Sequence, residues 1–175
     1  MRLVVLVVTL SLFVLSACAT IPTGDIKIDA DANKKVNFSE YKNYSWYAAA
    51  GILRDPEGKW KPPGFNADAE IKLLVDRELR KRGMTETNAN PDFLVAYVVG
   101  IDMTALKLKE NPDTQLTTLE NIPKGGLILL LVDPQTASAI WAAVATAELN
   151  EEMDIESRKK RLDYAITKMI KQLPK

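Results

Sequence analysis

Hydrophobic and polar residues alternate with different periods along the first hundred residues, and each period predicts a different element. Residues 25–29 alternate with period two, which is typical of a short strand. The aromatic-rich residues 41–47 predict a second strand. Residues 48–66 contain three glycines and three prolines and are predicted to form a long surface loop. Residues 93–101 are apolar on both faces, which predicts a central strand of a sheet.

Two segments have the spacing of amphipathic helices. The first is expected to begin at a cap provided by Asn66 or Asp68, to run to about Arg82 and to stop at Gly83. Its apolar positions form one stripe, which consists of Ala67, Ile71, Leu74, Val75 and Leu79. Residues 154–173 are expected to form the last helix. The apolar stripe of the last helix consists of Ile155, Leu162, Ile166, Met169, Ile170 and Leu173.

A loop and a hairpin are predicted between the two helices, after the central strand. Residues 103–124 are expected to form another long loop, with room for a short helix near Leu106. Residues 127–132 and 138–149 predict two strands joined by a type I turn at Asp133.

The predicted order of elements is strand, strand, helix, strand, strand, strand, helix. This order lacks the alternation of parallel α/β folds and predicts an α+β fold. We expect a mainly antiparallel sheet of about five strands, with the two helices packed on one face. Ala143, Ala145 and Ala147 recur on one face of the last strand, so the last helix is expected to dock over them. The alternative is that its apolar stripe is exposed and binds a partner.

The composition of the chain mainly excludes certain classes of function. The 175 residues suit one domain. Lys plus Arg and Asp plus Glu both count 23, so nothing favours a nucleic-acid partner. The absence of histidine excludes His-based catalysis and His metal sites. The single cysteine excludes an intramolecular disulfide and a multi-cysteine zinc site.

The N-terminus has the layout of a secretory signal. Arg2 precedes the almost entirely apolar residues 3–15. These 13 residues would span about 20 Å as a helix, which is short of a hydrocarbon core of about 30 Å. A cleaved signal peptide is therefore favoured over a permanent transmembrane helix.

The residues that follow resemble a lipobox, the site at which bacterial lipoproteins are lipidated and cleaved. They are Leu15, Ser16, Ala17 and Cys18. Cys18 is expected to carry a diacylglyceryl group, with a further acyl chain such as palmitate making the anchor lasting. The alternative is an ordinary secreted protein with an incidental cysteine. The expected organisation is a signal peptide at 1–17, a lipidated tether at 18–24 and one globular domain at 25–175.

The residue after the cysteine bears on location. It is Ala19, whereas an aspartate there is the usual inner-membrane retention signal in enteric bacteria. In a two-membrane bacterium this favours an outer-membrane anchor facing the periplasm. In another bacterium the anchor would hold the domain on the extracytoplasmic face of the cell membrane.

Four short segments occur in an order that resembles a known family. They are the run from Phe38 to Trp46, residues 91–97, residues 126–133 with Trp141 after the turn, and Leu173–Pro174. Together they resemble the bacterial lipoprotein family called domain of unknown function 4136, over essentially the whole mature domain. Ala142 and Ala143 stand where that family often has glycine soon after the tryptophan. The resemblance implies an envelope lipoprotein with no assigned activity.

Two sets of side chains suggest ligand sites, and each has a simpler explanation. Oxygen-bearing residues occur at EF-hand spacing at Asp29, Asp31, Asn33, Asn37 and Glu40. Lys34 replaces the glycine that such a loop requires, so we interpret the spacing as a coincidence and expect no metal or cofactor. An aromatic platform could consist of Tyr41, Tyr44, Trp46, Tyr47 and Trp60. Packing of a strand and its loop is the favoured explanation, and Tyr97 and Trp141 are expected to lie in the core.

The charged residues give little reason to expect an enzyme. Asp92 and Asp133 could form a carboxylate pair, but each lies beside a proline at a turn or strand entry. No nucleophile motif or Gly-rich phosphate loop accompanies them, so we expect no catalytic residue. The basic run 158–161 is interpreted as a solvated helix face that could touch anionic lipid headgroups.

The sequence thus favours a lipid-anchored envelope protein without catalytic activity that binds another envelope component. The alternative is a small-ligand or lipid-binding module that uses the loops 48–66 and 103–124. An apolar pocket of more than about 300 Å³ would favour the alternative. The oligomeric state stays open.

Overall fold

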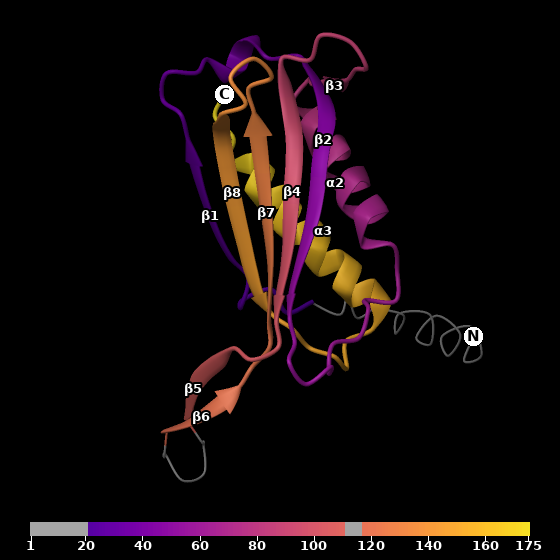
Figure 1. Cartoon of the computed structure of the whole chain (residues 1–175), viewed down its shortest axis with the longest axis vertical. Coiled ribbons are helices and arrows are strands. Elements are labelled where there is room, and N and C mark those ends of the chain that lie inside the picture. The colour runs from indigo at the N-terminus through magenta and orange to yellow at the C-terminus, as the bar shows by residue number, and fades with distance from the viewer. Residues whose placement is uncertain (1–20, 111–116) are drawn as a thin grey trace, which may run out of the picture.

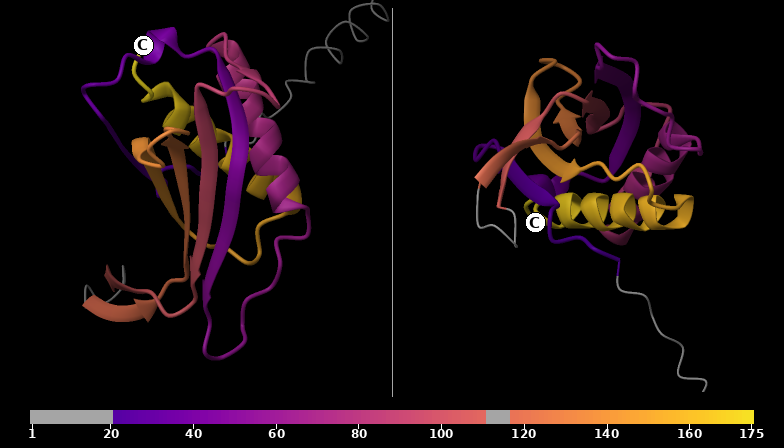
Figure 2. Two further views of the ribbon diagram at one scale, coloured as in Figure 1. Left: turned by 45° about the horizontal axis from the view of Figure 1, so that its top comes forward. Right: turned by 90° about the horizontal axis from the view of Figure 1, so that it is seen from below.

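The chain forms two layers, a curved sheet and a pair of helices, in a computed structural model that describes residues 21–110 and 117–175 (Figure 1). Both helices lie on one face of the sheet (Figure 2). In chain order the elements are β1 Lys27–Ala32, the 3-10 turn η1 Phe38–Glu40, β2 Asn43–Arg54, α2 Ala67–Lys81, β3 Thr85–Glu86, β4 Phe93–Asp102, β5 Leu106–Glu110, β6 Thr117–Asn121, β7 Lys124–Val132, β8 Ala139–Glu148 and α3 Ile155–Lys171. The lipobox and Cys18 lie outside the described residues.

The predicted α+β fold is confirmed, with one more strand in the main sheet than expected. The strand order is β1-β8-β7-β4-β2-β3. The pairs β1·β8, β8·β7 and β7·β4 are antiparallel. The pairs β2·β4 and β2·β3 are parallel, because α2 returns the chain to the same end of the sheet before β4. The sheet is therefore mixed but mostly antiparallel.

The two predicted long loops are corrected by the structure. β2 continues through residues 48–54, which pair in register with residues 96–102 of β4, so the loop shrinks to 55–66. The small residues of 48–51 have no alternating pattern to mark them as a strand, and pairing with β4 decides their conformation. Residues 103–124 contain no helix near Leu106 but the antiparallel strands β5 and β6, which form a small separate sheet below the main one (Figure 1).

The helix ends follow from local hydrogen bonds. The side chain of Asn66 accepts a hydrogen bond from the Ala69 amide at 3.0 Å, so Asn66 rather than Asp68 caps α2. Gly83 has a φ of 79°, the left-handed conformation expected after the end of that helix. Asp154 caps α3 by accepting from the Ser157 amide at 2.8 Å.

The last helix docks on the sheet largely as predicted. Ile166 is fully buried, and Ala143 and Ala145 beneath it are 0% and 5% exposed. Ala147 is only half-buried. Ile155 does not belong to the buried stripe, since it is 47% exposed and packs against the loop at Gly64 instead of the sheet.

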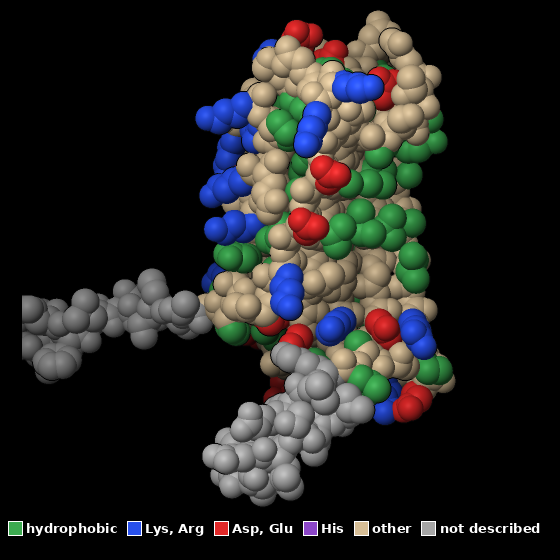
Figure 3. Space-filling view, turned by 90° about the vertical axis from the view of Figure 1, so that its left-hand side faces the viewer, with side chains coloured by type: hydrophobic (Ala, Val, Ile, Leu, Met, Phe, Trp, Pro, Cys, Tyr) green, Lys and Arg blue, Asp and Glu red, His purple; other side chains and the backbone are tan. Residues whose placement is uncertain are grey.

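The opposite face of the sheet is apolar and has no covering layer among the described residues. The outward residues of β2, β4, β7 and β8 are uncharged along most of each strand. Charged residues occur only in the last row at the lower end of these strands, which consists of Arg54, Asp102, Lys124 and Glu148. The larger members of the uncharged surface are Ile52, Leu94, Val98, Ile128, Leu130 and Val144. The outward residues of β1 are instead Lys27, Asp29 and Asp31. Figure 3 views the molecule from the side of β1, where hydrophobic side chains lie beside a few acidic ones.

Neither α2 nor α3, among the described residues, is long and apolar enough to cross a membrane.

Candidate ligand cavity

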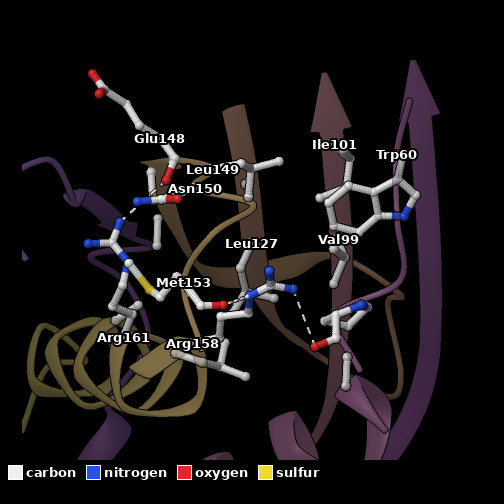
Figure 4. A pocket seen from close by; sticks show the side chains of 18 of the residues that line it. Trp60, Val99, Ile101, Leu127, Glu148, Leu149, Asn150, Met153, Arg158 and Arg161 are labelled. Carbon is white, nitrogen blue, oxygen red and sulfur yellow. Dashed lines mark hydrogen bonds between the residues drawn. The ribbon is translucent and has the colours of Figure 1, made fainter. Parts of the chain in front are cut away.

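A cavity of about 890 Å³ lies between the lower half of the sheet and the helical layer (Figure 4). Its walls come from the inner face of β2, β4, β7 and β8, from the loop 55–66, from residues 149–153 and from the first half of α3. The predicted loop 48–66 thus contributes to it, but the predicted loop 103–124 does not.

The cavity exists because the inward side chains become smaller from the top of the sheet to the bottom. One upper row across the sheet consists of Trp46, Val95, Leu131 and Trp141. Two rows further down, β2 and β8 have Gly51 and Ala145. In the row after that, β7 and β8 have Gly125 and Ala147, and all four residues belong to the cavity wall. The sheet and helices are filled by side chains above and leave space below.

Apolar side chains make up most of the wall. Figure 4 shows Val99 and Ile101 of β4 beside Trp60 from the loop, with Leu127 between them and the opposite wall. Pro62, Pro63, Phe65 and Leu162 add further apolar surface. Pockets of several hundred Å³ with mainly apolar walls are typical of sites for small apolar molecules.

Arg161 closes one side of the cavity and holds three segments together. Its guanidinium donates to the Asp25 carboxylate, with Nη1 and Oδ1 2.8 Å apart, and to the carbonyl oxygen of Pro22. Asp25 Oδ2 also accepts from the Glu148 amide at 3.0 Å. The side chains of Arg161 and Asp25 are only 11% and 23% exposed. The hydrogen bonds from Arg161 lower the pKa of Asp25.

Arg158 crosses the cavity wall between two loops. Its Nε donates to the Met153 carbonyl at 2.8 Å and its Nη2 to the Glu151 carbonyl at 2.7 Å. Its Nη1 donates to the Pro63 carbonyl at 3.4 Å.

The interpretation of residues 158–161 as a solvated face is therefore wrong for most of the run. Arg158 and Arg161 bind main-chain and carboxylate oxygens of other segments, and Lys159 pairs with Glu70 of α2 at 2.8 Å. Lys160 fits the prediction, since its side chain is 56% exposed. Four consecutive basic residues point around a helix, so only some of them face solvent.

The five aromatic residues form no common platform, and packing, the explanation favoured from the sequence, accounts for Tyr41, Tyr44 and Trp46. Tyr44 is fully buried, and both its hydroxyl and the Trp46 indole donate to Asp76 Oδ1, at 2.8 and 3.0 Å. Burial, followed by this hydrogen bond, raises the pKa of Tyr44. Tyr47 is 69% exposed. Tyr41 stacks on Phe93 with ring centroids 5.7 Å apart, and Trp60 alone of the five lines the cavity. Tyr97 and Trp141 lie in the core as predicted.

The two candidate carboxylates have separate local roles. Asp92 Oδ2 accepts from the amides of Lys42 and Asn43 at 2.8 and 2.7 Å, which fixes the start of β2. Asp133 Oδ1 accepts from the amides of Gln135 and Thr136, both at 2.8 Å, which closes the predicted turn. These backbone hydrogen bonds lower the pKa of Asp133.

The residues at EF-hand spacing are spread over a strand and a turn. Asp29 and Asp31 belong to β1, and Asn37 caps η1 and donates to Glu40 at 2.7 Å. Across residues 21–110 and 117–175, no group of three or more Asp, Glu, His or Cys side chains is placed to hold a metal ion.

One charged cluster that the sequence did not reveal joins the two helices away from the cavity. Glu78 is 5% exposed and accepts from Arg77 and Lys81, both at 2.8 Å. Burial raises the pKa of Glu78, but these hydrogen bonds outweigh it and the pKa is lowered. Arg77 also donates to Asp163 of α3, with Nη1 and Oδ2 2.9 Å apart. The cluster has paired charges throughout and links the helices to each other.

Solved structures with the same fold are only distantly related in sequence. A DUF4136 family protein from Bacteroides thetaiotaomicron is 9% identical, with a TM-score of 0.55 over 85% of this chain and 95% of that chain. A PDZ domain protein from Parabacteroides distasonis is 12% identical, with a TM-score of 0.53 over 86% of this chain and 37% of that chain. A minor lipoprotein from Acinetobacter baumannii is 16% identical over 76% of this chain and 89% of that chain, but its TM-score of 0.31 carries no argument. The first two likenesses show the fold alone.

The family is shown by the sequence itself. No curated protein matches the chain. Residues 28–175 match the family described as Domain of unknown function (DUF4136). Because this match covers most of the 175 residues, the chain belongs to the DUF4136 family.

Proposed function

We propose that this chain is a lipid-anchored envelope protein that catalyses no reaction and binds an aliphatic ligand in the sheet–helix cavity. The single observation that carries the proposal is the apolar cavity of about 890 Å³. Because of this cavity, we favour ligand binding as the main function over the binding of another envelope protein.

The size of the cavity suits a long hydrocarbon chain. An apolar cavity of roughly 150 Å³ already holds a benzene molecule. Each methylene group moved from water into apolar surroundings contributes about 0.8 kcal/mol. Ten such groups would contribute about 8 kcal/mol, which is in the range of micromolar affinity before the costs of association.

The position of the cavity relative to the predicted anchor also supports this function. Arg161 lines the cavity and binds the carbonyl oxygen of Pro22. Pro22 lies only four positions after Cys18. An extended chain of that length spans at most about 14 Å, so a lipidated Cys18 would keep the cavity close to the membrane surface. The membrane would then be the source of the ligand.

Filling the cavity should prevent labelling by an aliphatic probe. We expect Val99→Phe to reduce labelling of the full-length protein in membranes by a diazirine-bearing palmitate, because Val99 points into the cavity (Figure 4). Val98→Phe is the matched control, since the same substitution on the same strand lies on the outer face. Equal labelling of both variants and the parent would contradict the proposal.

A second candidate function rests on the uncovered outer face of the sheet. The uncharged surface extends across four adjacent strands, and contiguous apolar surface of this kind is typical of interaction sites. We propose that this face pairs with the same face of a second copy, because a two-fold contact needs only one self-complementary surface and this one has no charge to select another partner.

Self-association would test this second candidate. Val144 is 38% exposed on the outer face, so Val144→Lys should place like charges in the contact and shift sedimentation in mild detergent toward the monomer. Leu73→Lys is the control, because Leu73 is 62% exposed on α2. A parent protein that sediments as a monomer would contradict the pairing.

A further inference from the structure

Arg158 is a positive charge in a mainly apolar wall. Its three hydrogen bonds go to the main-chain carbonyls of Met153, Glu151 and Pro63. No Asp or Glu side chain in residues 21–106 and 121–175 forms an ion pair with it. A guanidinium keeps its charge at any physiological pH, so the charge of Arg158 is not balanced by a described carboxylate.

Arg158 retains the donors needed to bind an anion. A guanidinium has about five N–H donors in total. Three are used, on Nε, Nη1 and Nη2, which leaves one donor on Nη1 and one on Nη2. A carboxylate has two oxygens and matches paired guanidinium donors.

The other charged groups around the cavity do not take this role. Arg161 is already paired with Asp25. Lys61 also belongs to the cavity wall, but it is exposed to solvent, whereas Arg158 is half-buried. Glu151 and Glu152 are exposed at the rim. Figure 4 shows the carboxylate of Glu148 pointing away from Arg158. Arg158 is therefore the cation that an anionic group inside the cavity would meet.

We infer that the ligand is a single-chain fatty acid, with its aliphatic chain in the cavity and its carboxylate on Arg158. This inference rests on the proposed function of the cavity. Charge complementarity selects an anionic head, and the apolar wall selects a hydrocarbon tail. A neutral chain of the same length would fill the same space without pairing with Arg158.

Two probes with the same aliphatic tail but different head groups distinguish the contribution of the head group from that of the tail. Full-length protein in membranes is exposed to diazirine-bearing palmitic acid and, separately, to diazirine-bearing hexadecanol. We expect the acid to label the parent protein about tenfold more strongly than the alcohol, as for a hydrogen bond to a charged group. Arg158→Gln should remove this preference and keep the alcohol labelling. Lys160→Gln is the control on the exposed side of α3 and should keep the preference.

The outcomes distinguish this inference from the proposed function. Equal labelling of the parent by acid and alcohol would overturn the role of Arg158 and leave an aliphatic site. Absence of cavity labelling by both probes would overturn the site as well. Arg158 also joins two loops, so its variant could lose labelling by both probes; the preference of the parent protein then decides. Labelling that appears only in Cys18→Ser would assign the cavity to the acyl chains of the protein's own anchor and overturn the fatty acid.

Discussion

At the scale of single residues, Arg161 connects parts of the chain that are far apart in sequence. It binds Asp25 and Pro22 from a position on α3, and Asp25 in turn accepts from the Glu148 amide at the end of β8. The arginine thus fixes the start of the domain, the last strand and the last helix relative to one another. Its hydrogen-bonded partners lie about 120 residues or more away, apart from a weak contact to the Glu148 carbonyl.

The arginine–carboxylate contacts make the stability of the fold depend on pH. Hydrogen bonds from Arg161 and Arg77 lower the folded-state pKa values of Asp25 and Asp163. Their stabilisation is therefore complete above the unfolded pKa of about 3.9 and is lost as the pH falls through the folded pKa. We expect the urea midpoint to fall as the pH decreases below about 4.

Asp25→Asn should make that decline shallower, because it removes one of the groups whose folded-state pKa is lowered. Asp31→Asn is the control, since Asp31 is an exposed residue at the edge of β1. A midpoint that stays constant from pH 5 to pH 3 would show that these contacts do not contribute to stability.

Sequence reasoning could not assign the roles of Arg158 and Arg161. A basic residue on a helix looks the same whether it faces water or a carbonyl in another segment. The role of Asp25 is not visible in the neighbouring sequence either, because its partner Arg161 is brought close only when the chain folds. Asn66, Asp133 and Gly83 were predictable, since their roles depend on neighbours within a few residues.

At the scale of elements, the space between sheet and helices is set by side-chain size along β7 and β8. The inward residues of β8 change from Trp141 to three alanines, and those of β7 change from leucine to Gly125. The recurrence of Ala143, Ala145 and Ala147 was visible in the sequence and predicted helix docking. The helix does dock over the first two, but over Ala147 the same small side chain leaves part of the cavity.

Docking of α3 should account for much of the stability. Ile166 is fully buried, so Ile166→Ala should lower the free energy of unfolding by about 2–5 kcal/mol. Ile155→Ala provides the comparison on the same helix, because Ile155 is 47% exposed and should cost under about 1 kcal/mol. Equal urea midpoints for the two variants would contradict the assignment of Ile166 to the core.

The two loop predictions failed because strand pairing is not visible in local composition. Residues 48–54 are mostly small, and their partner in β4 lies about fifty residues away. β5 and β6 pair only with each other, outside the core, so no hydrophobic alternation is required of them. The helices and the central strand have one clear apolar pattern each and were placed correctly.

At the scale of the whole molecule, the cavity wall binds a residue that lies only four positions after the proposed anchor in the sequence. Pro22 is held at the cavity wall by Arg161, and the chain continues from there toward Cys18. In the proposed function, the cavity would exchange its ligand with the bilayer over a short distance.

The anchor can be tested independently of the cavity. Cys18→Ser should abolish lipidation and leave an uncleaved or soluble species, because the thiol that forms the thioether is lost. Intact-protein mass spectrometry of the membrane fraction measures this directly. A mature parent protein with an unmodified Cys18 would refute the lipoprotein assignment.

The most direct test of the account is to locate the residues that an aliphatic probe contacts. Full-length protein in membranes is photolabelled with diazirine-bearing palmitate, digested and mapped by mass spectrometry. We predict labels in residues 60–65, 125–127 and 145–153, which line the cavity. Labels confined to the outward residues of β4, β7 and β8 would show that the probe binds the open face of the sheet, and would contradict the cavity as the ligand site.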